Sequence, residues 1–318
     1  MTIKNQVVTV QRNQASNNNM LSFWGFVGPM FIGLLIFTYI PIIWGFYLSL
    51  HEARNTVTPQ EFVGFQNYID LIQTPAFIDA LQTGFLFALF IIPVTYAFSL
   101  GLALLVNDLP WGEGIFRTIF FIPTAVSYVI ASVIWKMSLF NGLPSGFMNN
   151  ILWYASGMSP VAWVNTVQPP LYWLVLVTVR LWLQAGFFMI ILLAGLKEIP
   201  KSLYEAARVD GAEPGWQTFR YITFPLLRGT SVSVVLLIMI QAFQAFDEFR
   251  NILTANAANA GGGNAILARP PLVYLYSIAF SDQNYGRGSA GAFIVTLIIV
   301  LVTLFQARIF GFGGEDTD

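Results

Sequence analysis

The sequence predicts an all-α integral membrane protein with about six transmembrane helices and both termini in the cytoplasm. Of its 318 residues, 56% are hydrophobic and only 10% are charged, and the mean hydropathy is +0.66. Soluble domains carry about 25% charged residues, so this chain lacks the polar surface that a soluble fold of its length needs. Its hydrophobic residues form long runs without strand-like alternation, and its basic residues favour one side of those runs.

Six hydrophobic runs define the predicted spans. A helix that crosses a hydrocarbon core of about 30 Å needs roughly 20 apolar residues. The runs of this length lie at about residues 21–50, 81–106, 115–140, 171–196, 229–250 and 291–311. The first run is too long for a signal peptide and lacks a small-residue cleavage pattern, so we expect a retained helix. The expected domains are a flexible cytoplasmic tail (1–19), a single transmembrane domain (20–311) and an acidic tail (312–318).

The distribution of Lys and Arg gives the orientation. If the N-terminus lies inside, nine basic residues are cytoplasmic: Lys4, Arg12, Arg117, Lys197, Lys201, Arg208, Arg220, Arg228 and Arg308. Four then lie outside: Arg54, Arg250, Arg269 and Arg287. Cytoplasmic loops carry the excess of Lys and Arg, so this asymmetry predicts cytoplasmic termini.

Several function classes are excluded by composition. A net charge of −1 offers no basic field for nucleic acid. The absence of Cys rules out thiolate catalysis, disulfides and cysteine-ligated metals, and the single His51 rules out a multi-histidine metal site. We therefore expect no metal site and no catalytic cluster, so the chain should not be an enzyme.

The segments predicted to lie outside differ in character. Residues 141–170 carry no charge but include Trp153 and Trp163, which suggests a segment lying at headgroup depth. Residues 251–290 contain the glycines 261–263 and are expected to form a flexible outer loop.

The interval 197–225 is the longest charged stretch between the hydrophobic runs. Ser202 and Glu205 have the spacing of a capping box, which predicts a short helix over residues 203–210. Gly211 follows where a left-handed residue ends a helix, and Pro214 can open a second short helix. The predicted unit is a cytoplasmic helix–turn–helix.

The first of these short helices carries a small-residue face. Ala206 and Ala207 leave a shallow surface that suits insertion into a groove of another protein. The alternative is a solvated amphipathic helix, and the residues alone leave both interpretations open.

This loop resembles the EAA loop of binding-protein-dependent ABC importer permeases. The segment EAARVDGA followed by ITFP matches that pattern at Glu205, Ala206, Ala207, Gly211, Ile222 and Pro225. Ten residues rather than nine separate the glycine from the isoleucine, and Phe224 stands where leucine is usual. Six segments also resemble the carbohydrate-uptake branch of these permeases: FVGFQNY (62–68), FRTIFFIP (116–123), VIW (133–135), LAGLKEIPKSLYEAARVDGA (193–212), FDEFRNILT (246–254) and YGRGSAGA (285–292).

The resemblance implies a function and an assembly. The loop would be the coupling element that docks into an ATPase subunit, with Glu205, Ala206, Ala207, Asp210 and Gly211 as its docking residues. The implied partners are a second permease subunit, a different chain in a heterodimer, two ATPase subunits and an external solute-binding protein, in the bacterial inner membrane. The chain has no phosphate-binding loop, so no cofactor is expected here, and ATP and Mg²⁺ would be bound by the ATPase partners.

Charged residues inside the runs are candidate functional groups. Arg180 is expected to form a structural ion pair with Asp247 or Glu248 rather than to contact solute. Lys136 lies near the outer end of its run and is expected to extend to the interface.

A transported sugar needs amide and hydroxyl partners and aromatic faces. The predicted solute-pathway residues are Trp182, Gln184, Gln241, Gln244, Asp247 and Glu248. Three of them, Gln241, Gln244 and Glu248, have the spacing of one helical face. The alternative is that these polar side chains only join the spans by hydrogen bonds.

The leading interpretation is a permease subunit of an ATP-driven importer that moves a sugar or sugar-like polyhydroxy solute by alternating access. The alternative is a secondary transporter driven by an ion gradient. That class usually shows acidic residues in mid-membrane and inverted repeats, which this sequence does not show. The solute itself is not specified by the sequence.

Overall fold

The fold of the computed structural model is all-helical over the residues that it describes, 15–166, 168–213, 215–254 and 268–309. Four helices in this part of the chain are long and apolar enough to cross a membrane, or up to six if each of two bent helix pairs forms one span. The predicted fold class and approximate number of spans are therefore confirmed. Among the described residues, β-structure is limited to isolated bridges such as the one between His51 and Phe62.

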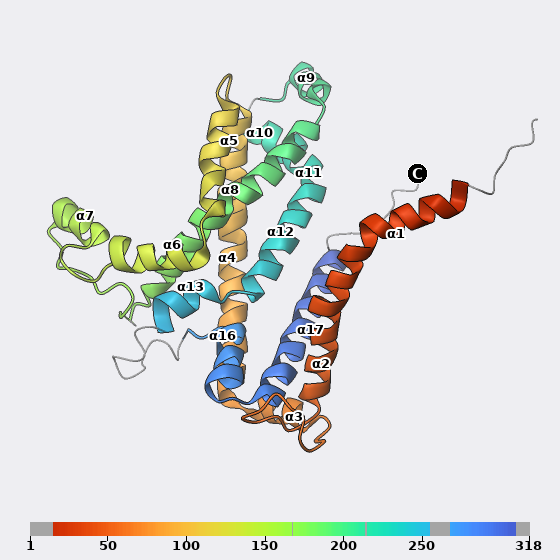
Figure 1. Cartoon of the computed structure of the whole chain (residues 1–318). Helices are drawn as coiled ribbons and strands as arrows, with labels where there is room; N and C mark the ends of the chain where they lie inside the picture. Colours follow the sequence, from red (N-terminus) through yellow and green to blue (C-terminus); the bar gives the residue numbers. More distant parts are fainter. Residues whose placement is uncertain (1–14, 167, 214, 255–267, 310–318) are drawn as a thin grey trace, which may run out of the picture.

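The N-terminal span stands apart from the core. It consists of α1 (Ala15–Leu34), η1 (Leu35–Tyr39) and α2 (Ile40–Ser49). None of its apolar window is buried, and only α2 packs beside α17 (Tyr285–Ile309), as Figure 1 shows. α1 begins at Ala15, so residues 15–19 of the predicted N-terminal tail are helical. The rest of the predicted N-terminal tail and the acidic tail at residues 312–318 lie outside the described residues.

The core is built around α8 (Tyr172–Glu198). Its apolar window is 61% buried, compared with 33% for α4 (Pro75–Asn107). Two close crossings fix its position. A Cβ on Gly186 would lie 1.7 Å from the carbonyl oxygen of Phe120 in α5 (Glu113–Phe121). A Cβ on Gly195 would lie 2.4 Å from the Thr230 hydroxyl of α12 (Arg228–Phe243). Only glycine permits these approaches, so α8 is held between α5 and α12.

The third predicted span, residues 115–140, is not one straight helix. α5 continues through η2 (Ile122–Ala125), then the chain turns by 93° into α6 (Tyr128–Ile134) and η3 (Trp135–Leu139). Pro123 lacks the N–H that would continue the helix. Ser127 then begins α6, and its hydroxyl accepts a hydrogen bond from the Val129 backbone N–H at 3.3 Å.

The fifth predicted span, residues 229–250, is also interrupted. α10 (Trp216–Thr218), η4 (Phe219–Thr223) and α11 (Phe224–Leu226) lead into α12 after a bend of 72°. α12 ends at Phe243, and a separate short helix follows, α13 (Asp247–Phe249) with η5 (Arg250–Thr254). The helix therefore ends before the charged pair at Asp247 and Glu248.

The connections contain more helix than predicted. Residues 51–80 include α3 (Gln66–Gln73), and the end of the expected loop 251–290 forms α16 (Pro271–Tyr276) and η6 (Ser277–Ser281). The three glycines of that loop lie outside the described residues.

Between α6 and α8 lies α7 (Phe147–Ser156). Trp153 is exposed, whereas Trp163 is buried and its indole N–H donates to the Asn149 side-chain oxygen at 3.0 Å. The Asn149 amide also donates to the carbonyls of Asn141, Leu143 and Val161. A buried amide thus holds this uncharged loop, which pulls Trp163 inward.

Candidate functional site

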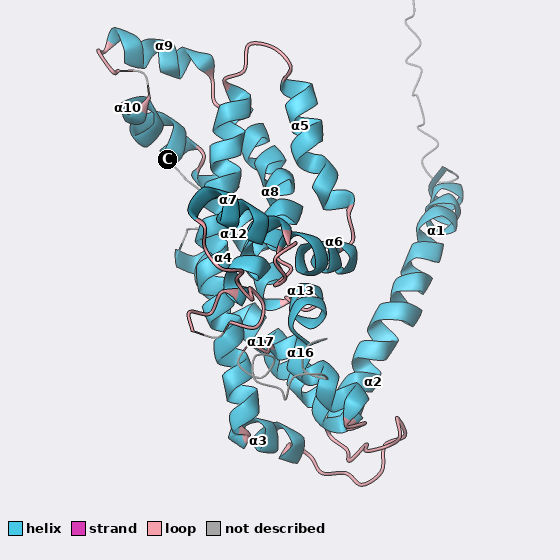
Figure 2. Ribbon diagram, turned by 90° about the vertical axis from the view of Figure 1, so that its left-hand side faces the viewer, coloured by secondary structure: helices cyan, strands magenta, loops and turns pink. Residues whose placement is uncertain are grey.

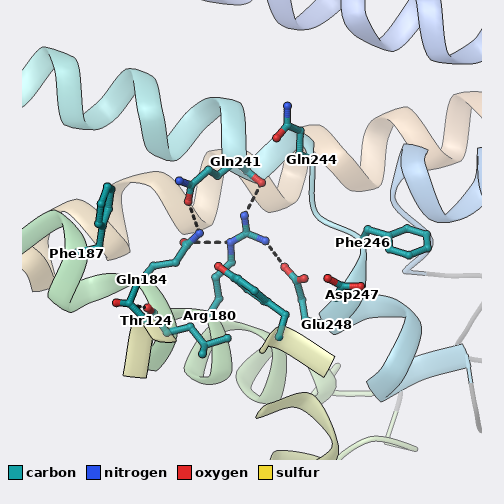
Figure 3. A pocket seen from close by; sticks show the side chains of 11 residues that line it. Thr124, Arg180, Gln184, Phe187, Gln241, Gln244, Phe246, Asp247 and Glu248 are labelled. Atoms are coloured by element: carbon teal, nitrogen blue, oxygen red, sulfur yellow. Dashed lines mark hydrogen bonds and ion pairs between the residues drawn. The ribbon is translucent and has the colours of Figure 1, made fainter. Parts of the chain in front are cut away.

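A cavity of about 320 Å³ lies where α8, α12, α13 and the bend between α5 and α6 meet (Figure 3). It is lined by Thr124, Tyr128, Arg180, Leu183, Gln184, Phe187, Gln241, Gln244, Phe246, Asp247 and Glu248. Both interrupted helices contribute to it. Thr124 and Tyr128 flank one bend, and Gln244 to Glu248 follow the end of α12. The breaks in the helices therefore create part of the cavity wall, and α8 supplies most of the rest.

Arg180 is the centre of the hydrogen-bond network in this cavity. Its Nη1 forms a buried ion pair with Glu248, with only 3% and 2% of the two residues exposed. Its Nε donates to Gln184 Oε1 at 3.2 Å, and Nη2 donates to the Gln241 carbonyl. Gln184 Nε2 in turn donates to Gln241 Oε1. The expected structural ion pair is confirmed, with Glu248 as the partner.

The end of α12 explains why Arg180 can bind a backbone carbonyl. The last carbonyls of a helix lack intrahelical N–H partners, and the helix dipole favours a cation at that end. Gln241 lies in the last turn of α12, so its carbonyl is available to Arg180. The guanidinium is also flanked by the rings of Phe87 and Tyr128, whose centroids are 5.3 and 5.9 Å from Cζ.

The structure brings together most of the predicted solute-pathway residues. Of the six, the cavity is lined by Gln184, Gln241, Gln244, Asp247 and Glu248. Trp182 is not part of it: its ring lies against Trp135, with centroids 4.9 Å apart. The proposed common helical face was wrong as well, because α12 ends before Glu248. The amides can both join the helices and contact solute. The hydrogen bond between the Gln184 and Gln241 side chains joins α8 to α12, and both residues line the cavity.

Sequence reasoning missed several lining residues. Thr124, Tyr128, Phe187 and Phe246 lie in the cavity wall, and Thr124 Oγ1 donates to the Leu183 carbonyl at 3.0 Å. A signal for Thr124 and Tyr128 was present, since Pro123 followed by Ser127 is a pattern for a helix end and a new helix start.

Lys136 contacts the backbone of the segment that follows α13. It is half-buried, and its Nζ donates to the Asn251 carbonyl of η5 at 3.4 Å. This contact ties the end of the α6–η3 arm to the segment that follows α13.

The 197–225 loop projects from the end of α8 as a separate unit (Figure 2). Its first helix is α9 (Lys201–Val209), which starts one residue before Ser202. Pro200 occupies the N-cap position without a side-chain hydrogen bond, so the predicted capping box is wrong. Proline favours a helix start because its N–H is not needed there, and this places Ser202 inside the first turn.

The end of α9 agrees with the prediction. Gly211 has φ +86°, and the Ala212 N–H donates to the Ala207 carbonyl at 2.8 Å. The expected left-handed residue is thus confirmed. Pro214, which was expected to open the second helix, lies outside the described residues. α10 begins after Gly215.

The surface of α9 is open. Among the predicted docking residues, Glu205, Ala206, Asp210 and Gly211 are exposed and Ala207 is half-buried. The apolar Val209 is 88% exposed. Tyr204 contributes an anchor instead, because its hydroxyl lies 3.1 Å from that of Thr223 in η4.

The chain is similar to known transport proteins over most of its length. The family model described as binding-protein-dependent transport system inner membrane component matches residues 96–310. A probable ABC transporter permease protein of Pyrococcus horikoshii is 31% identical over 293 residues, which are 92% of this chain and 96% of the relative. An alpha-glucoside transport system permease protein of Rhizobium meliloti is 30% identical over 296 residues, covering 91% of this chain and 82% of the relative.

The fold is also similar to that of a solved structure. A chain in the crystal structure of a bacterial alginate ABC transporter, in complex with an alginate pentasaccharide-bound periplasmic protein, superposes with a TM-score of 0.78. The superposition covers 94% of this chain and 97% of that chain, at 21% identity. This likeness supports the helical arrangement described above.

Proposed function

Because this chain belongs to the family of binding-protein-dependent transport system inner membrane components, we propose that the cavity at Arg180 is the path of a sugar or sugar-like polyhydroxy solute. The chain is a permease subunit of an ABC importer and a multi-pass inner membrane protein. Membership in this family argues against the ion-gradient alternative.

The observation that carries the proposal is the chemistry of the cavity wall. It combines amides, two hydroxyls, two carboxylates and the rings of Tyr128, Phe187 and Phe246. Sugar hydroxyls need donors and acceptors, while the C–H faces of a sugar pack on aromatic rings. The cavity volume of about 320 Å³ lies at the lower end of the usual range for small-molecule sites, roughly 300–1,000 Å³. The 30% identity to an alpha-glucoside permease supports the same solute class.

The free energy of ATP hydrolysis would be transmitted to this chain through the 197–225 loop. In this proposal the loop is cytoplasmic, as are both termini, and α9 docks on an ATPase subunit that binds ATP and Mg²⁺. Glu205, Ala206, Asp210 and Gly211 are exposed for this contact. The hydroxyl contact between Tyr204 and Thr223 links α9 to η4, which leads into α12. Movement of α9 would thereby reach the end of α12 that borders the cavity.

The proposed assembly contains this chain, a second and different permease subunit, two ATPase subunits and an external solute-binding protein. The structural relative supports the last of these, because it was solved with a solute-bound periplasmic protein. Two permeases would enclose the solute between them and alternate between inward and outward openings.

The test uses the complete complex in proteoliposomes, with ATP enclosed and the cognate binding protein outside. We expect ATP-dependent accumulation of labelled maltose or trehalose, and no accumulation without ATP. Gln244→Ala should raise the KM for uptake because Gln244 lines the cavity. Trp182→Phe is the matched control, since Trp182 packs on Trp135 outside it. Uptake driven by an ion gradient without ATP, or stimulation by amino acids and not by sugars, would contradict the proposal.

A further inference from the structure

We propose that this cavity selects against anionic solutes, because the one arginine among its described lining residues is neutralised by Glu248, while no described residue forms an ion pair with the Asp247 carboxylate. This inference rests on the proposed function, since it takes the cavity as the path of the solute. It deepens that function by naming the solute class as uncharged polyols and glycosides, and it excludes uronates and phosphate esters.

Arg180 is not available to bind an anion. Its guanidinium contacts Glu248, the Gln241 carbonyl and Gln184 Oε1, and only 3% of the residue is exposed. If Arg180 turned toward a solute anion, the buried Glu248 carboxylate would lose its counter-ion. Leaving a buried charge unpaired is strongly unfavourable, so the pair holds Arg180 in place.

The Asp247 carboxylate, in contrast, has no ion-pair partner among the described residues. It is half-buried in the cavity wall, and among the described residues its carboxylate takes part in no ion pair and accepts no hydrogen bond. Figure 3 shows it beside Glu248, with no dashed line to it. The charged lining residues are therefore Arg180, Asp247 and Glu248, one positive and two negative groups, so the described wall has a net charge of −1.

Two basic residues that lie in or against the segment after α13 do not offset this charge. The Arg250 guanidinium lies 3.9 Å from the ring centroid of Tyr276 and 5.7 Å from that of Phe246. The Lys136 ammonium donates to the Asn251 carbonyl. Neither side chain lines the cavity or forms an ion pair with Asp247 among the described residues.

A neutral polyol fits this electrostatic pattern. Its hydroxyls can donate to the Asp247 carboxylate, and hydrogen bonds to ionised acceptors are roughly twice as strong as neutral ones. The Gln244 amide, exposed on the same wall, offers both donors and an acceptor. A carboxylate or phosphate on the solute would meet Asp247 without any free cation among the described lining residues.

The absence of native Cys allows a test that does not require the natural solute. Gln244→Cys places a thiol on the cavity wall of the complete, nucleotide-free complex in nanodiscs. Its reaction rate is measured with cationic 2-(trimethylammonium)ethyl methanethiosulfonate and with anionic 2-sulfonatoethyl methanethiosulfonate. Tyr154→Cys on α7 is the reference site, since it is 87% exposed and its segment, residues 141–170, carries no charge.

The cationic reagent should react faster than the anionic one at Gln244→Cys, relative to their ratio at Tyr154→Cys. Adding Asp247→Asn should lower this preference by about tenfold at Gln244→Cys and leave Tyr154→Cys unchanged, because screening limits the effect of one charge to its neighbourhood. Thr124→Cys, on the opposite bend, is a second reporter if Gln244→Cys fails to assemble.

Faster reaction of the anionic reagent, or a ratio that Asp247→Asn leaves unchanged, would overturn the inference. Its failure can be told apart from failure of the proposed function. ATP-dependent sugar uptake without the electrostatic preference would refute only the selectivity. The preference without sugar uptake would refute only the solute assignment.

Discussion

Removing one member of the Arg180–Glu248 pair should destabilise the protein more than removing both. In Glu248→Gln, the Arg180 charge remains buried without a counter-ion. In Arg180→Met, the Glu248 carboxylate is left unpaired, and Gln184 and Gln241 each lose a donor. Replacing both by Met removes both charges and fills much of the same volume.

The magnitude follows from burial. Breaking a buried ion pair on one side costs about 3–5 kcal/mol, whereas its replacement by apolar residues is often neutral or better. If the two single substitutions were additive, the double variant would lose about 6–10 kcal/mol. We expect it to lose only about 1–3 kcal/mol, mainly the cost of leaving the Gln241 carbonyl and the Gln184 side-chain oxygen without the Arg180 donors.

The assay is reversible unfolding by SDS titration in mixed micelles, followed by the fluorescence of the nine tryptophans. The matched control is the pair of Asp70 and Arg287, whose side chains are 27% and 42% exposed. Arg287→Met should cost under about 1 kcal/mol, because exposed pairs contribute little. The reasoning is refuted if the double substitution is additive or if Glu248→Gln costs no more than Arg287→Met.

Three further substitutions probe the helix crossings, the loop and the buried amide. Gly186→Ala should lower the thermal unfolding temperature in detergent, because its Cβ would overlap the Phe120 carbonyl at a cost of about 1–3 kcal/mol or more. The control is Gly101→Ala, which has open space around the new Cβ and should be neutral or stabilising. Glu205→Lys should abolish solute-stimulated ATPase activity of the complex while its amount in the membrane is unchanged; normal coupled uptake would contradict the docking role. Asn149→Ala should cost about 2–4 kcal/mol in the same unfolding assay, because several buried backbone groups lose their partner.

Hydropathy predicted where the chain is long and apolar enough to cross a membrane, but not where its helices break. A hydropathy window counts residue types and ignores which backbone groups are hydrogen-bonded. The run 115–140 therefore looked continuous, although the segment from Pro123 to Ser127 turns the chain by 93°. In the same way, the run 229–250 concealed the end of α12 at Phe243.

Residue chemistry predicted most of the polar residues that line the cavity, but the helical face on which they were grouped was wrong. Gln241 and Gln244 were grouped with Glu248 as one helical face, yet a break in the backbone brings them to one cavity. Phe246 has φ −144° and ψ −61° outside helical geometry, and there the chain turns into α13. Spacing arguments assume a continuous helix, so they cannot predict such a turn. The prediction that Trp182 lines the solute pathway was wrong for a related reason, because aromatic character does not specify which neighbour a ring will face.

The broken helices and the polar network are physically one feature. Within a membrane each unpaired backbone group needs a partner, so a helix end at that depth is tolerated only where polar groups or water satisfy it. At the end of α12 the partner of the Gln241 carbonyl is Arg180, and a buried arginine in turn requires Glu248. The helix end, the cation and the counter-ion therefore depend on one another. Any displacement of α12 against α8 must also change the contacts of Gln241 with Arg180 and Gln184. A motion that starts at α9 and moves α12 would therefore alter the cavity wall.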